Sequence, residues 1–354
     1  MEKCKNSCVK TLFVFVLTAA VLCPAGIGIG HAQSLKAYVS TQDGSKVLVY
    51  NLISHQLIKS IDIYKPTRLQ QTLAPNANGI LALGDRIFLT VPGAEISKFG
   101  INEIKVIDAR SESIVSTIKT DMTPSELLEY QGKIYVVCRY GNTIQEIDPD
   151  NLKIVRTIAF KAPAQGPLNN PLSMEIANGK IYLPFPGGLA RPGFIQILDL
   201  KTGNPLKTIE FSSTSPYGPL AIKKAGESKI YLGGIRSVAV LDVQTDRIIK
   251  NIVLSSRELY VQSLAVQDQK LYAANGVSTL SVIDIRTDTL ITDMDTGYHD
   301  YACHLKAGIA AYENRVLVAD AGRGIKIIDT IKNKLIMTIA SEEPLGPVAV
   351  IGSK

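Results

Sequence analysis

The chain has 354 residues, of which 46% are hydrophobic and 20% are charged, and its formal net charge is +6. This is the composition of a globular protein, and so small a charge on so long a chain excludes a dense nucleic-acid-binding tract. Tryptophan is absent, which excludes the Trp-Asp signature of WD40 repeats, and the sequence has no CxxC, HExxH or P-loop motif for redox, zinc or nucleotide chemistry.

The first 32 residues have the pattern of an export signal. Three lysines among the first ten residues precede an apolar stretch over 11–23, and Gly30-His31-Ala32 resembles a small-x-small cleavage site. The apolar stretch is too short to span a bilayer comfortably, and a retained anchor is the alternative. We predict a signal peptide over residues 1–32 and a mature chain, 33–354, that is periplasmic or secreted and is not inserted in the membrane.

The mature chain repeats one pattern seven times. An apolar pair followed by Asp recurs with a period of roughly 45 residues. The repeated position is Asp108, Asp148, Asp199, Asp242, Asp284 and Asp329, with Asn51 as a weaker first copy. Each period holds four short β-branched runs separated by polar turns, and no segment shows sustained helical periodicity. The sequence therefore predicts an all-β fold, a seven-bladed β-propeller with four-stranded blades, as one domain.

The recurring aspartate follows the third strand of each repeat. An Asp at such a position accepts hydrogen bonds from backbone N–H groups two and three residues later and closes the turn. We expect this structural role, and the alternative is a ring of catalytic or metal-binding carboxylates, which would have to converge.

The two ends of the mature chain predict how the ring closes. Residues 35–39 match a second strand, so the first blade lacks its inner strand, and residues 346–351 match the missing one. We expect the C-terminal strand to pair with residues 36–40 in blade 1, which leaves no open sheet edge.

Two stretches resemble a known repeat family. Lys133-Ile134-Tyr135-Val136-Val137 through Asp148, and Leu271-Tyr272-Ala273-Ala274-Asn275 through Asp284, are similar to the YVTN β-propeller repeat, although no copy reads Tyr-Val-Thr-Asn. The resemblance extends over most of residues 35–354. It implies an exported or surface seven-bladed propeller used for binding, and because relatives include lactonases and lyases it does not imply one activity.

Loop length nominates one face of the propeller for binding. The connections between blades and between second and third strands are the long ones, and long loops in a compact domain are usually functional. Candidate ligand-binding residues in these loops are Arg68, Arg139, Arg191, Arg236, Arg323, Tyr140 and Tyr301. Arginine offers paired donors to carboxylate or phosphate; the alternative is ordinary exposed side chains that form surface ion pairs. We predict an anionic small molecule, peptide or partner protein bound around the central channel.

One segment of the same face holds residue types used in catalysis. Residues 298–304 include His299, Cys303 and His304, and His304 could act as a general base. The spacing matches no established metal motif, so we expect a structural loop with no metal and no cofactor. One alternative is that His299 and His304 contact the ligand, and another is that histidine, thiolate and carboxylate groups of this segment bind zinc or copper. A disulfide between Cys138 and Cys303 is not expected, because nonadjacent blades hold them too far apart.

The residues favour a monomeric binding or scaffold protein over an enzyme, and no nucleic-acid partner is expected. The sequence has no Gly-x-Ser-x-Gly nucleophile motif. The alternative function is a hydrolase or lyase of the lactonase kind that works at the same central mouth.

Overall fold

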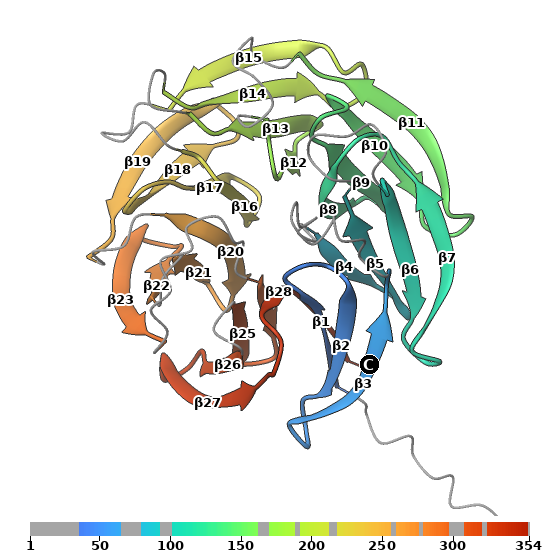
Figure 1. Cartoon of the computed structure of the whole chain (residues 1–354). Helices are drawn as coiled ribbons and strands as arrows, with labels where there is room; N and C mark the ends of the chain where they lie inside the picture. The colour runs from blue at the N-terminus through green and yellow to red at the C-terminus, as the bar shows by residue number, and fades with distance from the viewer. Residues whose placement is uncertain are drawn as a thin grey trace, which may run out of the picture. The chain divides into compact units, whose positions relative to one another are not determined.

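The computed structural model describes residues 35–64, 79–92, 101–161, 170–187, 192–211, 218–255, 260–275, 279–296, 308–320 and 324–352. The chain divides into two units, Met1–Gln33 and Ser34–Lys354, and all described residues belong to the second. Within that unit, seven antiparallel four-stranded sheets are arranged around a common centre (Figure 1). The predicted all-β, seven-bladed propeller is confirmed.

Each blade contributes one strand to each of four layers, counted outward from the centre (Figure 1). The innermost strands are β28 (Leu345–Ile351), β4 (Ile80–Leu83), β8 (Pro124–Tyr130), β12 (Glu175–Ala177), β16 (Ala221–Ala225), β20 (Val261–Gln267) and β24 (Gly308–Tyr312). The second strands are β1 (Lys36–Thr41), β5 (Arg86–Val91), β9 (Lys133–Cys138), β13 (Lys180–Phe185), β17 (Lys229–Gly233), β21 (Lys270–Asn275) and β25 (Arg315–Asp320). The third strands are β2 (Lys46–Asn51), β6 (Glu103–Asp108), β10 (Thr143–Asp148), β14 (Phe194–Asp199), β18 (Ser237–Asp242), β22 (Thr279–Asp284) and β26 (Gly324–Asp329). The outermost strands are β3 (Gln56–Asp62), β7 (Ser113–Lys119), β11 (Lys153–Ala159), β15 (Pro205–Glu210), β19 (Arg247–Val253), β23 (Thr289–Asp295) and β27 (Lys334–Ala340).

Burial along the strands follows from the stacking of blades. Second strands such as β9 are buried at nearly every position because a neighbouring blade covers each face of the sheet, so these strands are continuous apolar runs. Outermost strands such as β11 alternate between exposed and part-buried residues because they lie at the rim. The buried side chains form seven clusters, and in each cluster the residues come mainly from two neighbouring blades.

The C-terminal strand closes the ring. β28 pairs with β1 in antiparallel register, with Lys36 opposite Ile351 and Val39 opposite Val348, and the register shifts once before Thr41. Leu345 and Val348 then pack in the cluster between blades 7 and 1. The predicted completion of blade 1 by the C-terminus is confirmed.

The recurring aspartates close the turns between third and fourth strands. The Oδ1 atom of Asp284 accepts hydrogen bonds from the backbone N–H groups of Arg286, at 2.7 Å, and Thr287, at 3.1 Å. Asn51, Asp108, Asp148 and Asp329 accept the same two bonds. Asp199 and Asp242 accept the bond from the backbone N–H three residues later. Their predicted structural role is confirmed.

A second feature of two of these turns joins a blade to the one before it. The residue four positions after the aspartate has a positive φ, which is 50° at Asp246 and 55° at Asp288. Lys180 donates to Asp246 Oδ2 at 2.6 Å and Tyr182 donates to Asp246 Oδ1 at 2.8 Å, so blade 4 is bonded to the turn of blade 5. We call this Lys–Tyr–Asp contact the interblade latch.

The latch occurs again between blades 5 and 6. Lys229 and Tyr231 of blade 5 donate to Asp288 of blade 6 at 2.7 and 2.5 Å. The turn of blade 4 has Gly203 at the position of the acceptor, so it offers no side chain to blade 3. Lys133 of blade 3 instead donates from its Nζ atom to Asp148 in its own blade. The Lys-x-Tyr openings of β13 and β17 are therefore explained by contacts with the next blade.

Candidate functional site

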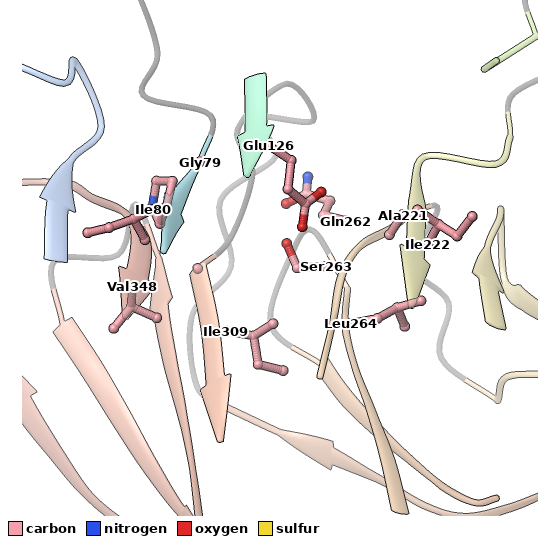
Figure 2. A pocket seen from close by; sticks show the side chains of 12 residues that line it. Gly79, Ile80, Glu126, Ala221, Ile222, Gln262, Ser263, Leu264, Ile309 and Val348 are labelled. Carbon is pink, nitrogen blue, oxygen red and sulfur yellow. The ribbon is translucent and has the colours of Figure 1, made fainter. Parts of the chain in front are cut away.

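The inner strands enclose a hollow at one end of the central channel. Each inner strand starts where the chain enters a blade from the previous one, and residues in or next to the first four positions of six such strands line the hollow. Its empty volume is about 510 Å³, including the part open to solvent. The residues that line it, which we call the channel hollow, are Gly79, Ile80, Glu126, Ala221, Ile222, Gln262, Ser263, Leu264, Gly308, Ile309, Pro347 and Val348 (Figure 2).

The walls of the channel hollow are mainly apolar. Ile80, Ile222, Leu264, Ile309 and Val348 occupy equivalent positions in their blades, since each pairs with the fourth residue of the second strand. The equivalent residue in blade 3 is Leu127, which pairs with Val136 and is not among the residues that line the hollow. An apolar ring thus surrounds the hollow on the sides of blades 1, 2, 5, 6 and 7.

Two glycines let neighbouring inner strands approach closely. A Cβ atom at Gly308 would lie 2.2 Å from the carbonyl oxygen of Gly346, and a Cβ atom at Gly79 would lie 2.5 Å from the carbonyl oxygen of Ser125. Only glycine fits at such distances without a backbone shift. These positions therefore fix the narrow spacing of the strands at the hollow.

Polar groups enter the hollow from blades 3 and 6. Glu126, on β8, directs its side chain toward the middle of the hollow (Figure 2). Ile80 and Val348 lie on one side of it and Ile222 and Leu264 on the other (Figure 2). Gln262 and Ser263, at the start of β20, bring an amide and a hydroxyl group to the same lining. An apolar cavity with a few convergent polar groups is the usual form of a small-molecule site.

Two further charges lie next to this cavity on the inner strands of blades 4 and 5. Lys223 Nζ lies 3.5 Å from Glu175 Oε1, and the Glu175 side chain is 5% exposed whereas that of Lys223 is 37% exposed. Burial raises the pKa of Glu175. The negative charge of Glu175, and then that of Glu126, raises the pKa of Lys223, so Lys223 stays protonated.

The sequence did not single out Glu126, Glu175 or Lys223. The detectable signal was a charge within an inner-strand run that is apolar in the other repeats. Glu175 and Lys223 pair with Tyr182 and Tyr231, at the position that is Ala265 in blade 6. Aligning the seven inner strands would therefore have shown three ionisable residues in three consecutive blades.

Two of the arginines predicted to bind an anion lie in the described part of the chain. Arg139, at the end of β9, is 8% exposed; its Nε atom donates to the carbonyl oxygen of Asn170 at 3.3 Å and its guanidinium lies 5.6 Å from the Tyr140 ring centre. Arg236, between β17 and β18, is exposed and has a φ of 50°. Arg139 thus joins blade 3 to the segment before blade 4, and Arg236 faces solvent.

The other predicted contact residues lie outside the described residues. They are Arg68, Arg191, His299, Tyr301, His304 and Arg323. Their role stays a prediction, and so does that of Cys303.

Cys138, the cysteine that the structure describes, is free and buried. Its thiol lies 3.6 Å from Gln145 Oε1, and burial raises its pKa to about 12. A buried thiol that is held neutral in this way is a weak nucleophile at neutral pH. Within the described ranges, no three His, Cys, Asp or Glu side chains gather as a metal ion would require.

In the same part of the chain, no helix is both long and apolar enough to cross a bilayer.

Comparison with known proteins shows the fold. No protein family pattern matches the sequence, and no curated protein matches it. Apo AztD from Citrobacter koseri matches with a TM-score of 0.63 at 13% identity, covering 91% of this chain and 99% of that one. A second AztD structure from the same organism matches with a TM-score of 0.61 at 14% identity, with the same coverage of both chains. The computationally designed Ika8 protein matches with a TM-score of 0.59 at 12% identity, covering 92% of this chain and 94% of that one. At these identities the likeness shows a β-propeller and no activity.

Proposed function

We propose that this protein is a binding protein that holds a small ligand in the channel hollow. The observation that carries the proposal is the hollow itself, an apolar ring around one carboxylate, one amide and one hydroxyl group. Glycines narrow the ring and the blades on either side are packed, so the site is formed before the ligand arrives. Because the AztD structures show only the same fold, they are consistent with a binding role and do not identify the ligand.

The proposal includes a family and a location. We infer a YVTN-type propeller because the Lys-x-Tyr strand and the Ile-Asp strand occupy equivalent places in successive blades, where they make the latch and the turn cap. We infer export to the periplasm or the medium from the signal pattern over residues 1–32.

The anionic ligand predicted from the loop arginines is a second candidate. Arg236 favours it because that side chain is exposed at the end of blade 5 where the inner strand begins and where the channel hollow lies. Arg139 contributes less to this idea because it is buried and bonded to Asn170. The hydrolase or lyase alternative depends on His304, which lies outside the described residues.

The hollow is tested by methyl NMR with hexan-1-ol as a neutral apolar probe. We expect saturable shifts of the Ile80, Ile222 and Ile309 methyl groups and none at Ile336, which is exposed on the outer strand β27. Ile309→Phe, whose part-buried side chain can grow into the hollow, should weaken the binding of the probe. Small shifts that rise linearly with alcohol concentration at all these methyl groups would refute the proposed site.

A further inference from the structure

Exposed aliphatic side chains gather on two neighbouring blades. Of the twelve large hydrophobic side chains exposed in the described residues, blades 1 and 7 carry three each, and the other five blades carry one or two each. Blades 1 and 7 are neighbours because the ring closes between them. Single exposed apolar residues need no explanation, but a group of them marks an interaction surface. The six residues, which we call the apolar rim, are Ile53, Leu57 and Ile58 in blade 1 and Ile331, Leu335 and Ile336 in blade 7.

The two most exposed members of the apolar rim lie in the turns between third and fourth strands. They are Ile331, which is 70% exposed, and Ile53, which is 64% exposed. Each lies two positions after the residue that caps its turn, and its backbone N–H donates to that cap. The other five blades hold polar or charged residues at this position, which are Arg110, Asp150, Lys201, Gln244 and Arg286. Two adjacent turns therefore present isoleucine where the repeat elsewhere presents a polar side chain.

The outermost strands continue this apolar surface. Leu57 and Leu335 are exposed, whereas the corresponding residues of blades 2, 3, 5 and 6 are half-buried. Ile58 and Ile336 are the extra residues of β-bulges, because the partners on either side of each are paired and they are not. A bulge disrupts the ladder and keeps an edge from pairing with another strand. The apolar rim is thus suited to contact through side chains and not to the addition of a strand.

The charges of the same turns and strands are mainly positive. Residues 51–60 and 329–338 hold three lysines, Lys59, Lys332 and Lys334, and one carboxylate, Asp329. Lys332 and Lys334 are exposed. Asp329 accepts two hydrogen bonds from the backbone of its own turn. Exposed aliphatic side chains beside a surplus of lysine are typical of a surface that contacts anionic lipid.

The strands next to the apolar rim add charges in pairs of opposite sign. From blade 6, Lys270 donates to the carbonyl oxygen of Thr330, and Asp268 accepts from the hydroxyl group of the same residue. At blade 1, Lys36 lies 2.6 Å from Glu112 of the next blade. These pairs leave the positive surplus of the turns unchanged.

The N-terminal segment of the chain joins the propeller at the apolar rim. The backbone N–H of Leu52 donates to the carbonyl oxygen of Leu35 at 2.9 Å, so the first described residue lies against the turn that carries Ile53. Only residues 24–34 separate Leu35 from the apolar stretch of the predicted export signal. An export signal acts at a membrane. The turn of blade 1 is therefore joined by a short length of chain to the segment that is delivered to a bilayer.

We propose that the apolar rim docks the propeller on a bilayer surface that contains anionic phospholipid, with Ile53 and Ile331 among the lipids and Lys332 and Lys334 at the headgroups. The contact is peripheral, and no strand crosses the bilayer. The apolar rim lies at the end of the short turns, whereas the inner strands begin at the channel hollow at the other end. The hollow stays open on a docked molecule, and this inference does not depend on its ligand. A second copy of the chain fits the rim less well, because a symmetric contact brings the lysines of both molecules together.

Methyl NMR of the full chain shows which residues touch the bilayer. Small amounts of vesicles made of equal parts of phosphatidylglycerol and phosphatidylcholine are added, with and without a spin-labelled lipid. We expect the spin label to broaden the methyl signals of Ile53 and Ile331 and to leave that of Ile249, which is exposed on the outermost strand of blade 5, unchanged. Attachment through residues 1–32 alone would broaden the three signals equally. Equal broadening, or none, would overturn the inference.

Vesicle flotation measures the apolar contribution. The double variant Ile53→Ser, Ile331→Ser should bind the same vesicles at least about tenfold more weakly, because two largely exposed isoleucines no longer leave water on docking. The matched control is Val155→Ser, Ile249→Ser, at two exposed positions on the outermost strands of blades 3 and 5. It should change binding less than about twofold. Equal binding by the two double variants would overturn the inference.

A second pair of variants measures the electrostatic contribution. Lys332→Gln, Lys334→Gln should weaken binding to the anionic vesicles about tenfold and leave binding to pure phosphatidylcholine vesicles unchanged, and added salt should reproduce the loss. Lys153→Gln, Lys201→Gln removes the same number of exposed lysines from blades 3 and 4 and is the control. Equal losses in both would mean that net charge, and not the apolar rim, attracts the vesicles, which would overturn the inference.

Sedimentation without vesicles tests the other occupant of the apolar rim. We expect no dimer that depends on Ile53 and Ile331. A dimer that forms in the wild-type protein and is lost in Ile53→Ser, Ile331→Ser would mean that a second copy covers the rim, and the lipid assignment would be wrong. All the substitutions are at exposed positions and should leave folding intact. Should one of them prevent folding, the NMR experiment on the wild-type protein still decides.

Discussion

The interblade latch at Asp246 should contribute measurably to stability. Asp246→Ala removes the acceptor of two hydrogen bonds, from Lys180 at 2.6 Å and from Tyr182 at 2.8 Å. The side chains of Lys180 and Asp246 are only 24% and 15% exposed, so water replaces the lost contacts incompletely. The backbone at this position has a φ of 50°, which alanine tolerates less well than aspartate does.

The lost hydrogen bonds and the backbone strain together give the expected loss in the free energy of unfolding. A hydrogen bond to a charged group contributes about 1.5–3 kcal/mol, and the left-handed backbone costs alanine roughly 1 kcal/mol. Allowing for partial rehydration of Lys180 and Tyr182, we expect Asp246→Ala to lower the free energy of unfolding by about 3 kcal/mol, which is a fall in Tm of about 4–5 °C for a domain of this length.

Two further variants divide the effect. Asp246→Gly removes both bonds but relieves the backbone strain, so it should lose about 2 kcal/mol. Asp246→Asn keeps an acceptor for Tyr182 and should lose about 1 kcal/mol. Asp150→Ala, at an exposed aspartate in the corresponding turn of blade 3, is the control and should change stability by less than about 0.5 kcal/mol. Thermal melts that place all three Asp246 variants level with the control would refute the latch.

Two other predictions concern the ring and its turns. Deletion of residues 344–354 removes β28 from blade 1 and removes Leu345 and Val348 from the cluster between blades 7 and 1. It should lower the free energy of unfolding by several kcal/mol, which is comparable to the whole stability of a domain (about 5–15 kcal/mol). A Tm within about 2 °C of that of the intact protein would contradict this prediction. Hydrogen bonds from the turn lower the pKa of Asp242 and Asp284 below the ordinary value of 3.8. The folded state therefore binds fewer protons than the unfolded state, so the stabilisation is complete above pH 3.8 and is lost as the pH falls through the lowered pKa values. Melts between pH 6 and pH 2 check this, and Asp242→Asn should flatten the acid limb of the curve.

The sequence predicted those parts of the fold that depend on local pattern. The turn aspartates were identifiable because their partners lie two and three residues away, and the pairing of the closing strand with blade 1 followed from its likeness to the other inner strands. The latch was missed because its partners lie far apart: Tyr182 and Asp246 are separated by 64 residues. Each half recurs in the sequence, but nothing local indicates that one half bonds to the next repeat.

The site was harder to predict for a related reason. An inner strand contributes only one to three residues to the channel hollow, and the geometry of the whole ring decides which ones they are. Arg139 shows the reverse case. Sequence pattern assigned it to an exposed loop, but its side chain is buried because Asn170, from the segment before the next blade, supplies a carbonyl acceptor.

The two ends of the propeller perform different tasks. The latches join second strands to the following turns at the end where the short turns lie, whereas the channel hollow is formed at the opposite end, where the inner strands begin. The blades can therefore be held together without using the residues that line the hollow.

A ring of near-identical blades presents nearly equivalent groups on every side, so it can orient a single small ligand only where the repeat is broken. In the channel that break is the run of Glu126, Glu175 and Lys223 in blades 3, 4 and 5, beside apolar or small residues in the other blades. We therefore propose that the specificity of this protein lies at the departure from the repeat, more than in the repeat itself.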